Sequence, residues 1–91
     1  SRRSERQARA QQRQQEQSIR KQITNLETDI EKTSAKLTPI ESLLANKETY
    51  DTLTSDDLDK LLLNAGKLRK QLEKGEEQWL ELSQKLEDQR G

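Results

Sequence analysis

The sequence has no cysteine and no histidine among its 91 residues. Without cysteine it can form no disulfide and offers no thiolate nucleophile. Without histidine it lacks the usual general base, and the two absences together remove the ligands of the common zinc sites. The carboxylates are dispersed, with no base, nucleophile or metal cluster beside them. We therefore expect this chain to be no enzyme and to hold no cofactor, and the lack of cysteine fits a reducing cytoplasm.

Apolar residues are also scarce. Hydrophobic residues make up 27% of the sequence and charged residues 37%, with one tryptophan and one tyrosine. This is too little for a sheet core and enough for one narrow seam between helices. The abundant Leu, Lys, Glu, Gln and Arg favour helix, and only one proline and three glycines oppose it. No apolar run approaches the ~18 residues that a membrane span needs, so we expect no membrane contact. The composition predicts an elongated all-α protein.

Two stretches carry an unbroken heptad rhythm, with steps of three and four residues between apolar positions. The first comprises Ile19, Ile23, Leu26, Ile30, Thr33, Leu37, Ile40 and Leu44. The second comprises Leu58, Leu61, Ala65, Leu68, Leu72, Gly75, Trp79, Leu82 and Leu86. This spacing is typical of coiled-coil helices, whose apolar residues form one seam.

The short connection between the two stretches predicts antiparallel neighbours. Asn46 is expected to end the first helix, and Thr54 with Asp57 forms a capping box for the second. Folding about Asp51 places every seam residue of the first stretch opposite a seam residue of the second. The sequence thus predicts a two-helix antiparallel coiled-coil hairpin. The residues expected to fix its structure are Ile23, Leu26, Ile30, Leu72, Gly75, Trp79 and Leu82.

Pro39 lies inside the first seam. An interior proline costs about 3 kcal/mol and kinks or breaks a helix. Thr38 and Glu41 around it also match the capping box of a new helix, with proline at the first position. We therefore expect the first helix to be kinked or restarted near Pro39.

The chain has equal numbers of basic and acidic residues, 17 of each, yet the heptad positions sort them. One side of the hairpin is expected to collect Lys32, Lys36, Lys60, Lys67, Lys74 and Lys85, with the acids Asp29, Asp57, Glu81 and Asp88 mostly near its ends. The other side is expected to collect Glu27, Glu31, Glu41, Asp59, Glu73, Glu76 and Glu87, against Arg20 and Arg69. The lysine side is either a contact surface or the solvated face that any coiled coil must have.

Residues 1–17 hold five arginines and no large apolar side chain. We interpret them as a basic linker or helix extension and residues 18–90 as the coiled-coil domain. Guanidinium groups match phosphates, whereas the alternative is a flexible, solvated tail. No aromatic residue is interleaved for base stacking, so contact would be with the backbone of the nucleic acid. The candidate nucleic-acid-binding residues are Arg2, Arg3, Arg6, Arg9, Arg13, Arg20, Lys21, Lys32, Lys36, Lys67 and Lys74.

Three segments together resemble a known family: SIRKQITNLETDIEK, ETYD in the turn, and EEQWLELSQKLED. They are similar to the C-terminal domain of the ABC-F ATPases, which are soluble, duplicated ATP-binding cassette proteins, and especially to its Uup-like group. The resemblance covers about residues 18–88. Tyr50 in the turn and Trp79 with Leu82 near the end carry most of its specificity.

The resemblance implies a parent protein that hydrolyses ATP with magnesium in two upstream cassette domains, whose motifs this sequence does not contain. It implies a cytoplasmic accessory domain that contacts DNA or ribosomal RNA, with the ribosome and translation as its setting, and that adjoins the parent cassettes. The chain would be a monomer or a weak or swapped dimer. The alternative is a protein-docking coiled coil with no nucleic-acid role, which would use the acidic side and the off-seam leucines Leu62, Leu63 and Leu80.

Overall fold

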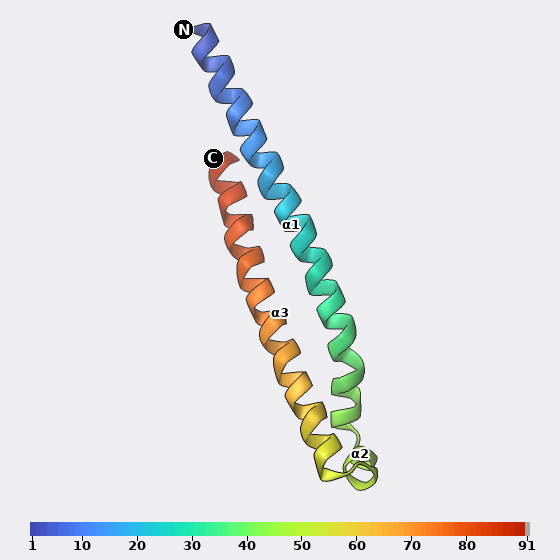
Figure 1. The fold of residues 1–91 in the computed structure, drawn as a ribbon. Coiled ribbons are helices and arrows are strands. Elements are labelled where there is room, and N and C mark those ends of the chain that lie inside the picture. The colour runs from blue at the N-terminus through green and yellow to red at the C-terminus, as the bar shows by residue number, and fades with distance from the viewer. Residues whose placement is uncertain (91) are drawn as a thin grey trace.

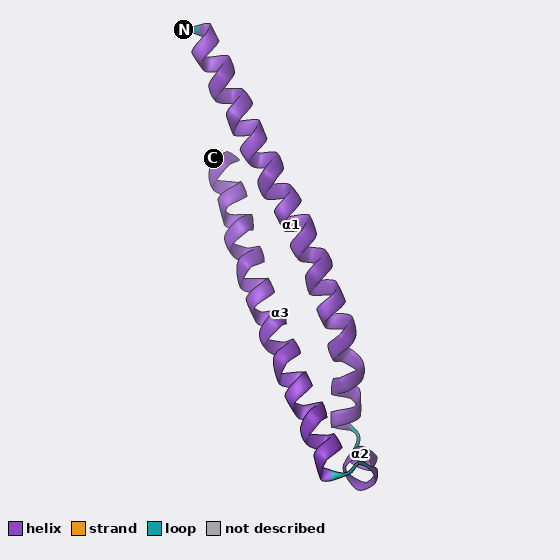
Figure 2. Ribbon diagram, in the orientation of Figure 1, coloured by secondary structure: helices purple, strands orange, loops and turns teal. Residues whose placement is uncertain are grey.

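The computed structural model describes residues 1–90 and contains three helices (Figure 1). These are α1 (Arg2–Ala45), α2 (Lys47–Thr52) and α3 (Ser55–Arg90). No strand occurs in this range (Figure 2), which confirms the all-α prediction. The expected count of two helices is wrong, because the connection between the long helices contains α2.

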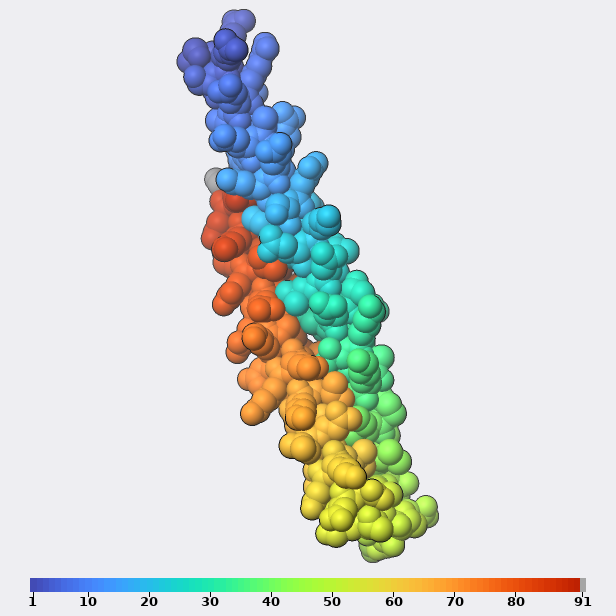
Figure 3. Space-filling model, viewed as in Figure 1, coloured from blue at the N-terminus to red at the C-terminus, as the bar shows by residue number. Residues whose placement is uncertain are grey.

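The two long helices lie side by side and run in opposite directions, with α2 at the end where the chain turns back (Figure 1). The molecule measures 74 × 17 × 15 Å, and its radius of gyration is 20.9 Å. A compact domain of this length would have a radius of gyration of about 12 Å. The rod shape in Figure 3 therefore confirms the predicted elongation.

The core is a thin line of side chains between α1 and α3. Leu37, Ala65 and Leu68 form its buried cluster, and further seam residues pack against them. A Cβ atom on the buried Gly75 would lie 3.0 Å from Ile30 Cγ1 and 4.0 Å from Leu26 Cδ1, so the glycine fits close against α1. These neighbours agree with the register that the heptads predict. The residues packed around the buried cluster are Ile40, Leu44 and Leu72, and Ile23, Trp79 and Leu82 are half-buried farther along.

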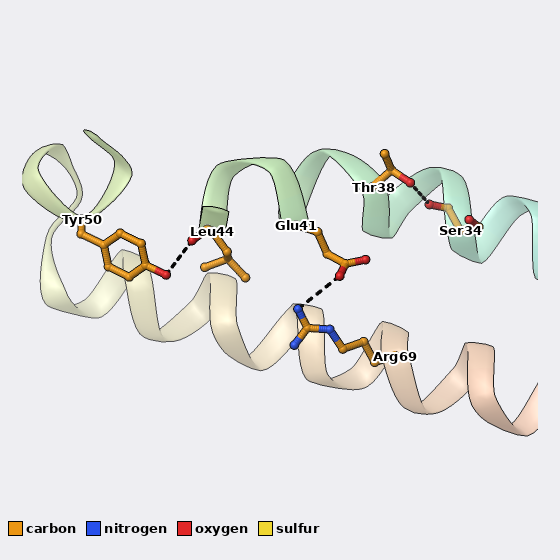
Figure 4. A network of polar contacts seen from close by, with 6 residues as sticks. All are labelled: Ser34, Thr38, Glu41, Leu44, Tyr50 and Arg69. Atoms are coloured by element: carbon orange, nitrogen blue, oxygen red, sulfur yellow. Dashed lines mark hydrogen bonds and ion pairs between the residues drawn. The ribbon is translucent and has the colours of Figure 1, made fainter. Parts of the chain in front are cut away.

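In the turn, side chains cap the starts of α2 and α3, and a tyrosine hydroxyl bonds the turn to α1. Asn46 ends α1, and its Oδ1 accepts a hydrogen bond from the Glu48 amide at 3.1 Å, which caps α2. Thr54 Oγ1 accepts from the Asp57 amide at 3.2 Å, as the capping box predicts. The Tyr50 hydroxyl donates to the Leu44 carbonyl at 2.7 Å (Figure 4) and so ties the turn to the end of α1.

The helix passes through Pro39 without a break, so the predicted restart is wrong. The Thr38 hydroxyl donates to the Ser34 carbonyl at 2.9 Å (Figure 4) and forms no cap. Leu37 and Ile40, on either side of the proline, both pack in the seam, and this packing keeps the helix in one phase. The proline itself is exposed to solvent.

Replacing Pro39 with alanine should stabilise the protein by about 1–3 kcal/mol, because alanine restores a helical amide and the site is exposed. Urea unfolding followed by circular dichroism measures the change. Thr38→Ala serves as the control and should change the unfolding free energy by less than about 0.5 kcal/mol. A loss of stability in Pro39→Ala would show that the proline is needed where it stands.

Candidate nucleic-acid interface

The first helix is longer than its partner and extends past it. Gln12 Nε2 donates to the Gln89 carbonyl at 2.8 Å, and Gln89 Nε2 donates to Gln15 Oε1 at 3.2 Å. The end of α3 therefore lies beside Gln12, and the preceding turns of α1 continue beyond it (Figures 1 and 3). We call residues 2–13 the leader.

The leader is helical although it packs against almost nothing. Ser1 caps it, since the Ser1 hydroxyl accepts from the Ser4 amide at 3.3 Å. Glu5 in the first turn is favoured by the helix dipole, and it pairs with Arg9 at 3.7 Å. Alanine, glutamine and arginine are good helix formers. In the structure the opening stretch is helical and continuous with the paired part of α1.

The arginines of the leader are all exposed. Steps of four, three and four residues place Arg2, Arg6, Arg9 and Arg13 along one stripe of the helix. The leader contains one acidic residue, Glu5, which lies at 66% side-chain exposure in its pair with Arg9. The result is a rod with several solvated guanidinium groups and little acidic charge to neutralise them.

The lysines among the candidate residues lie elsewhere. Lys32 and Lys36 are on α1, Lys67 and Lys74 are on α3, and all four are exposed. Contact between Leu37 and Leu68 places their neighbours Lys36 and Lys67 at the same level. Lys74 lines a shallow groove together with Asp29, Gln71 and Gln78, so acidic charge accompanies it.

The opposite side of the seam carries a different groove. It is lined by Ile30 and Trp79 at its floor, with Glu27, Glu31, Ser34 and Glu76 around them. The acidic side predicted from the heptads thus includes an apolar groove, which the sequence analysis did not identify. Trp79 at a seam position, beside the small Gly75, was the signal that pointed to it.

The candidate residues do not form one surface. Arg9 and Lys32 are 23 positions apart on one helix, about 35 Å at 1.5 Å per residue. Arg20 and Lys21 are exposed between the leader and the lysines. Arg13 and Arg20 precede Glu27 by two and one heptads, so they lie on the side of the acidic groove. The structure brings together the leader arginines and leaves the lysines as a separate set.

Other kinds of site find little support in the described residues. Residues 1–90 contain no group of three or more carboxylates placed to hold a metal ion. Over the same range, no helix has the length and apolar character to cross a bilayer. Comparison of the chain with models of protein families, with curated proteins and with solved structures found no match.

The leader should open far more readily than the paired part of the same helix. A single helix shorter than about 12 residues is marginal in water, whereas residues 26–40 pack against α3. We expect amides of residues 6–11 to exchange with deuterium at least ~100-fold faster than those of residues 26–40. Exchange followed by NMR measures this, and equal protection of both segments would contradict it.

Proposed function

We propose that the chain is a nucleic-acid-binding accessory domain of the kind that ABC-F ATPases carry at their C-terminal end. The observation that carries the proposal is the leader, which extends past α3 and exposes its arginines. Its partner would be the phosphate backbone of DNA or ribosomal RNA, since guanidinium forks match phosphate oxygens. The upstream cassettes of such a parent would supply ATP hydrolysis, and this chain would supply attachment.

The shape of the leader suits a polyanion. An α-helix with its side chains is about 10–12 Å across, which fits the DNA major groove, about 12 Å wide, and residues 2–11 extend for about 15 Å at 1.5 Å per residue. Duplex DNA carries one charge per about 1.7 Å of its axis, so several phosphates lie within reach of such a helix. The leader has no aromatic residue to stack on bases, and the binding we propose is therefore independent of sequence.

The rest of the molecule would act as a stiff arm. We propose that α1 and α3 form a two-helix antiparallel coiled-coil hairpin, with α2 as part of its turn and a bend in α1 at Pro39. Such an arm would fix the distance between the leader and the turn at Tyr50. Lys32, Lys36, Lys67 and Lys74 on one side of the arm would add a second, weaker contact with nucleic acid.

Charge reversal in the leader tests the proposal. With about four phosphates neutralised, affinity for a 20-base-pair DNA or RNA duplex should fall roughly 100-fold between 50 and 200 mM salt. Arg6→Glu, Arg9→Glu and Arg13→Glu together should lower the affinity at 50 mM salt by at least about tenfold. Fluorescence anisotropy of the labelled duplex measures both effects.

A control variant with the same change in net charge tests whether the loss of affinity depends on where the altered residues lie. Lys47→Glu, Lys60→Glu and Lys70→Glu change the net charge equally, but these residues lie in α2 and the part of α3 nearer the turn. This variant should keep most of the affinity of the unaltered protein. Equal losses in the two variants, or binding that does not respond to salt, would contradict an interface at the leader.

The protein-docking alternative is favoured by one specific observation. Leu62, Leu63 and Leu80 are exposed at 45%, 62% and 62%. Their replacement with serine should leave nucleic-acid binding unchanged. If these substitutions abolish recruitment of a protein partner while leader charge reversal has no effect on any binding, the docking function is the correct one.

A further inference from the structure

One side of the molecule, which we call the Trp79 side, contains an apolar groove surrounded by carboxylates. The groove measures about 370 Å³, and Ile30 with the half-buried Trp79 provides its apolar surface. Glu27, Glu31 and Glu76 line it and are exposed. The ion pairs within the described part of the chain are Arg9 with Glu5 and Arg69 with Glu41, so none of the three carboxylates has a cationic partner there.

The same side of α1 is basic in the leader. Arg9 and Arg13 precede Glu27 and Glu31 by 18 positions, which is five complete turns at 3.6 residues per turn. Because α1 is continuous from Arg2 to Ala45, the arginines lie in line with the two glutamates, about 27 Å farther along the helix. A single side of a single helix therefore has a basic end and an acidic middle.

We infer that two copies of the chain associate antiparallel through their Trp79 sides, with the leader of each lying on the groove of the other. A two-fold axis at the level of Arg20 places Arg9 opposite Glu31 and Arg13 opposite Glu27 of the second copy. This follows because both pairs have position 20 as their midpoint. Two-fold symmetry repeats each pair, so four ion pairs form at once.

The groove adds contacts that ion pairs alone would lack. Glu76 lines the groove together with Glu27 and Glu31, so it would face the same leader. The Trp79 ring lines the groove, and a guanidinium over an indole face is attracted by the negative face of the ring. An arginine from the leader would thus meet both carboxylates and an aromatic surface.

A second copy suits this groove because each molecule carries both the basic leader and the acidic groove that would bind it. The paired helices also leave much apolar surface uncovered: the buried hydrophobic residues of the described chain are Ile19, Leu37, Ala65 and Leu68. The described part of α3 reaches Gln12 of the leader, and the leader arginines are exposed in their own molecule. Exposed ion pairs are largely screened by water and salt and contribute little each, so the dimer is weak and salt-sensitive.

Arg20 lies at the two-fold axis and therefore distinguishes the dimer from the proposed nucleic-acid function. The two copies of Arg20 approach each other there, and like charges oppose association. Arg20→Gln should therefore tighten the dimer by about two- to fivefold, which corresponds to a few tenths of a kcal/mol to about 1 kcal/mol. The proposed nucleic-acid function makes the opposite prediction for this residue, because loss of a cation can only weaken phosphate binding.

Sedimentation equilibrium of the protein alone tests the dimer. At 50 mM salt and rising concentration the mass should increase from 10.6 kDa towards twice that value, and 500 mM salt should return it to the monomer. Arg9→Glu with Arg13→Glu, or Glu27→Arg with Glu31→Arg, should each abolish association. All four substitutions together restore both the charge balance and the complementarity, and should restore the dimer.

The control is Lys32→Glu with Lys36→Glu, which changes the net charge as much as the leader pair but lies on the other side of α1. It should leave the dimer in place. A monomer at ~0.5 mM under low salt, or a dimer that the four-residue variant fails to restore, would overturn the inference. The single tryptophan offers a second readout, since its emission should shift with concentration as the groove is covered.

The experiment also separates the other occupants of the groove. If the protein stays monomeric but an oligo-arginine peptide shifts the Trp79 emission, the groove binds a basic segment of another protein and the second copy is wrong. No nucleic acid is present in these measurements. A dimer without nucleic-acid binding, or the reverse, would therefore reject one proposal and leave the other intact.

Discussion

Close contact between α1 and α3 at small residues is the constraint on which the rest of the structure depends. Ala65 is completely buried between Leu37 and Leu68, and Gly75 meets Ile30 at a distance that leaves no room for a methyl group without adjustment. These two positions set the spacing of the helices, and the leucines and isoleucines between them set the register. Once the register is fixed, the level of each turn of α3 along α1 is fixed as well, and Gln89 therefore lies beside Gln12 and Gln15.

The heptad spacing predicted the two long helices and their register, and Asn46 and Thr54 predicted the helix caps. Both kinds of feature depend on residues close together in the sequence, so they can be recognised there. Two features could not be obtained in this way. Pro39 matched a helix start as well as it matched an interior position, and only the packing of Leu37 and Ile40 decided between them. The short helix α2 has no apolar period to reveal it, since it is six residues long and is held by Asn46, the buried Thr49 and the Tyr50 hydroxyl bond.

The candidate site was predictable in its residues and not in its arrangement. The sequence identified the leader arginines and the side lysines as candidates for nucleic-acid binding, but not how far apart they lie. The separation of about 35 Å between Arg9 and Lys32 follows from the continuity of α1 between them, which a disordered leader would have changed. The glutamines that join the two helices at Gln12, Gln15 and Gln89 were missed because a polar continuation of a seam resembles a solvated surface.

A net charge of zero conceals a molecule that is strongly polar along its length. The leader is basic, and the side of α1 that follows it is acidic around Trp79. Under the two proposals, the leader arginines would bind either phosphates or the carboxylates of a second copy. Because the same guanidinium groups would serve both, the two occupants would exclude each other, and nucleic acid should dissociate the dimer. Both contacts would weaken with salt, but phosphate binding would also gain from counterion release, which exposed carboxylates offer far less. That difference would favour phosphate binding where a polyanion is present, and the carboxylates around Trp79 would hold the leader where none is.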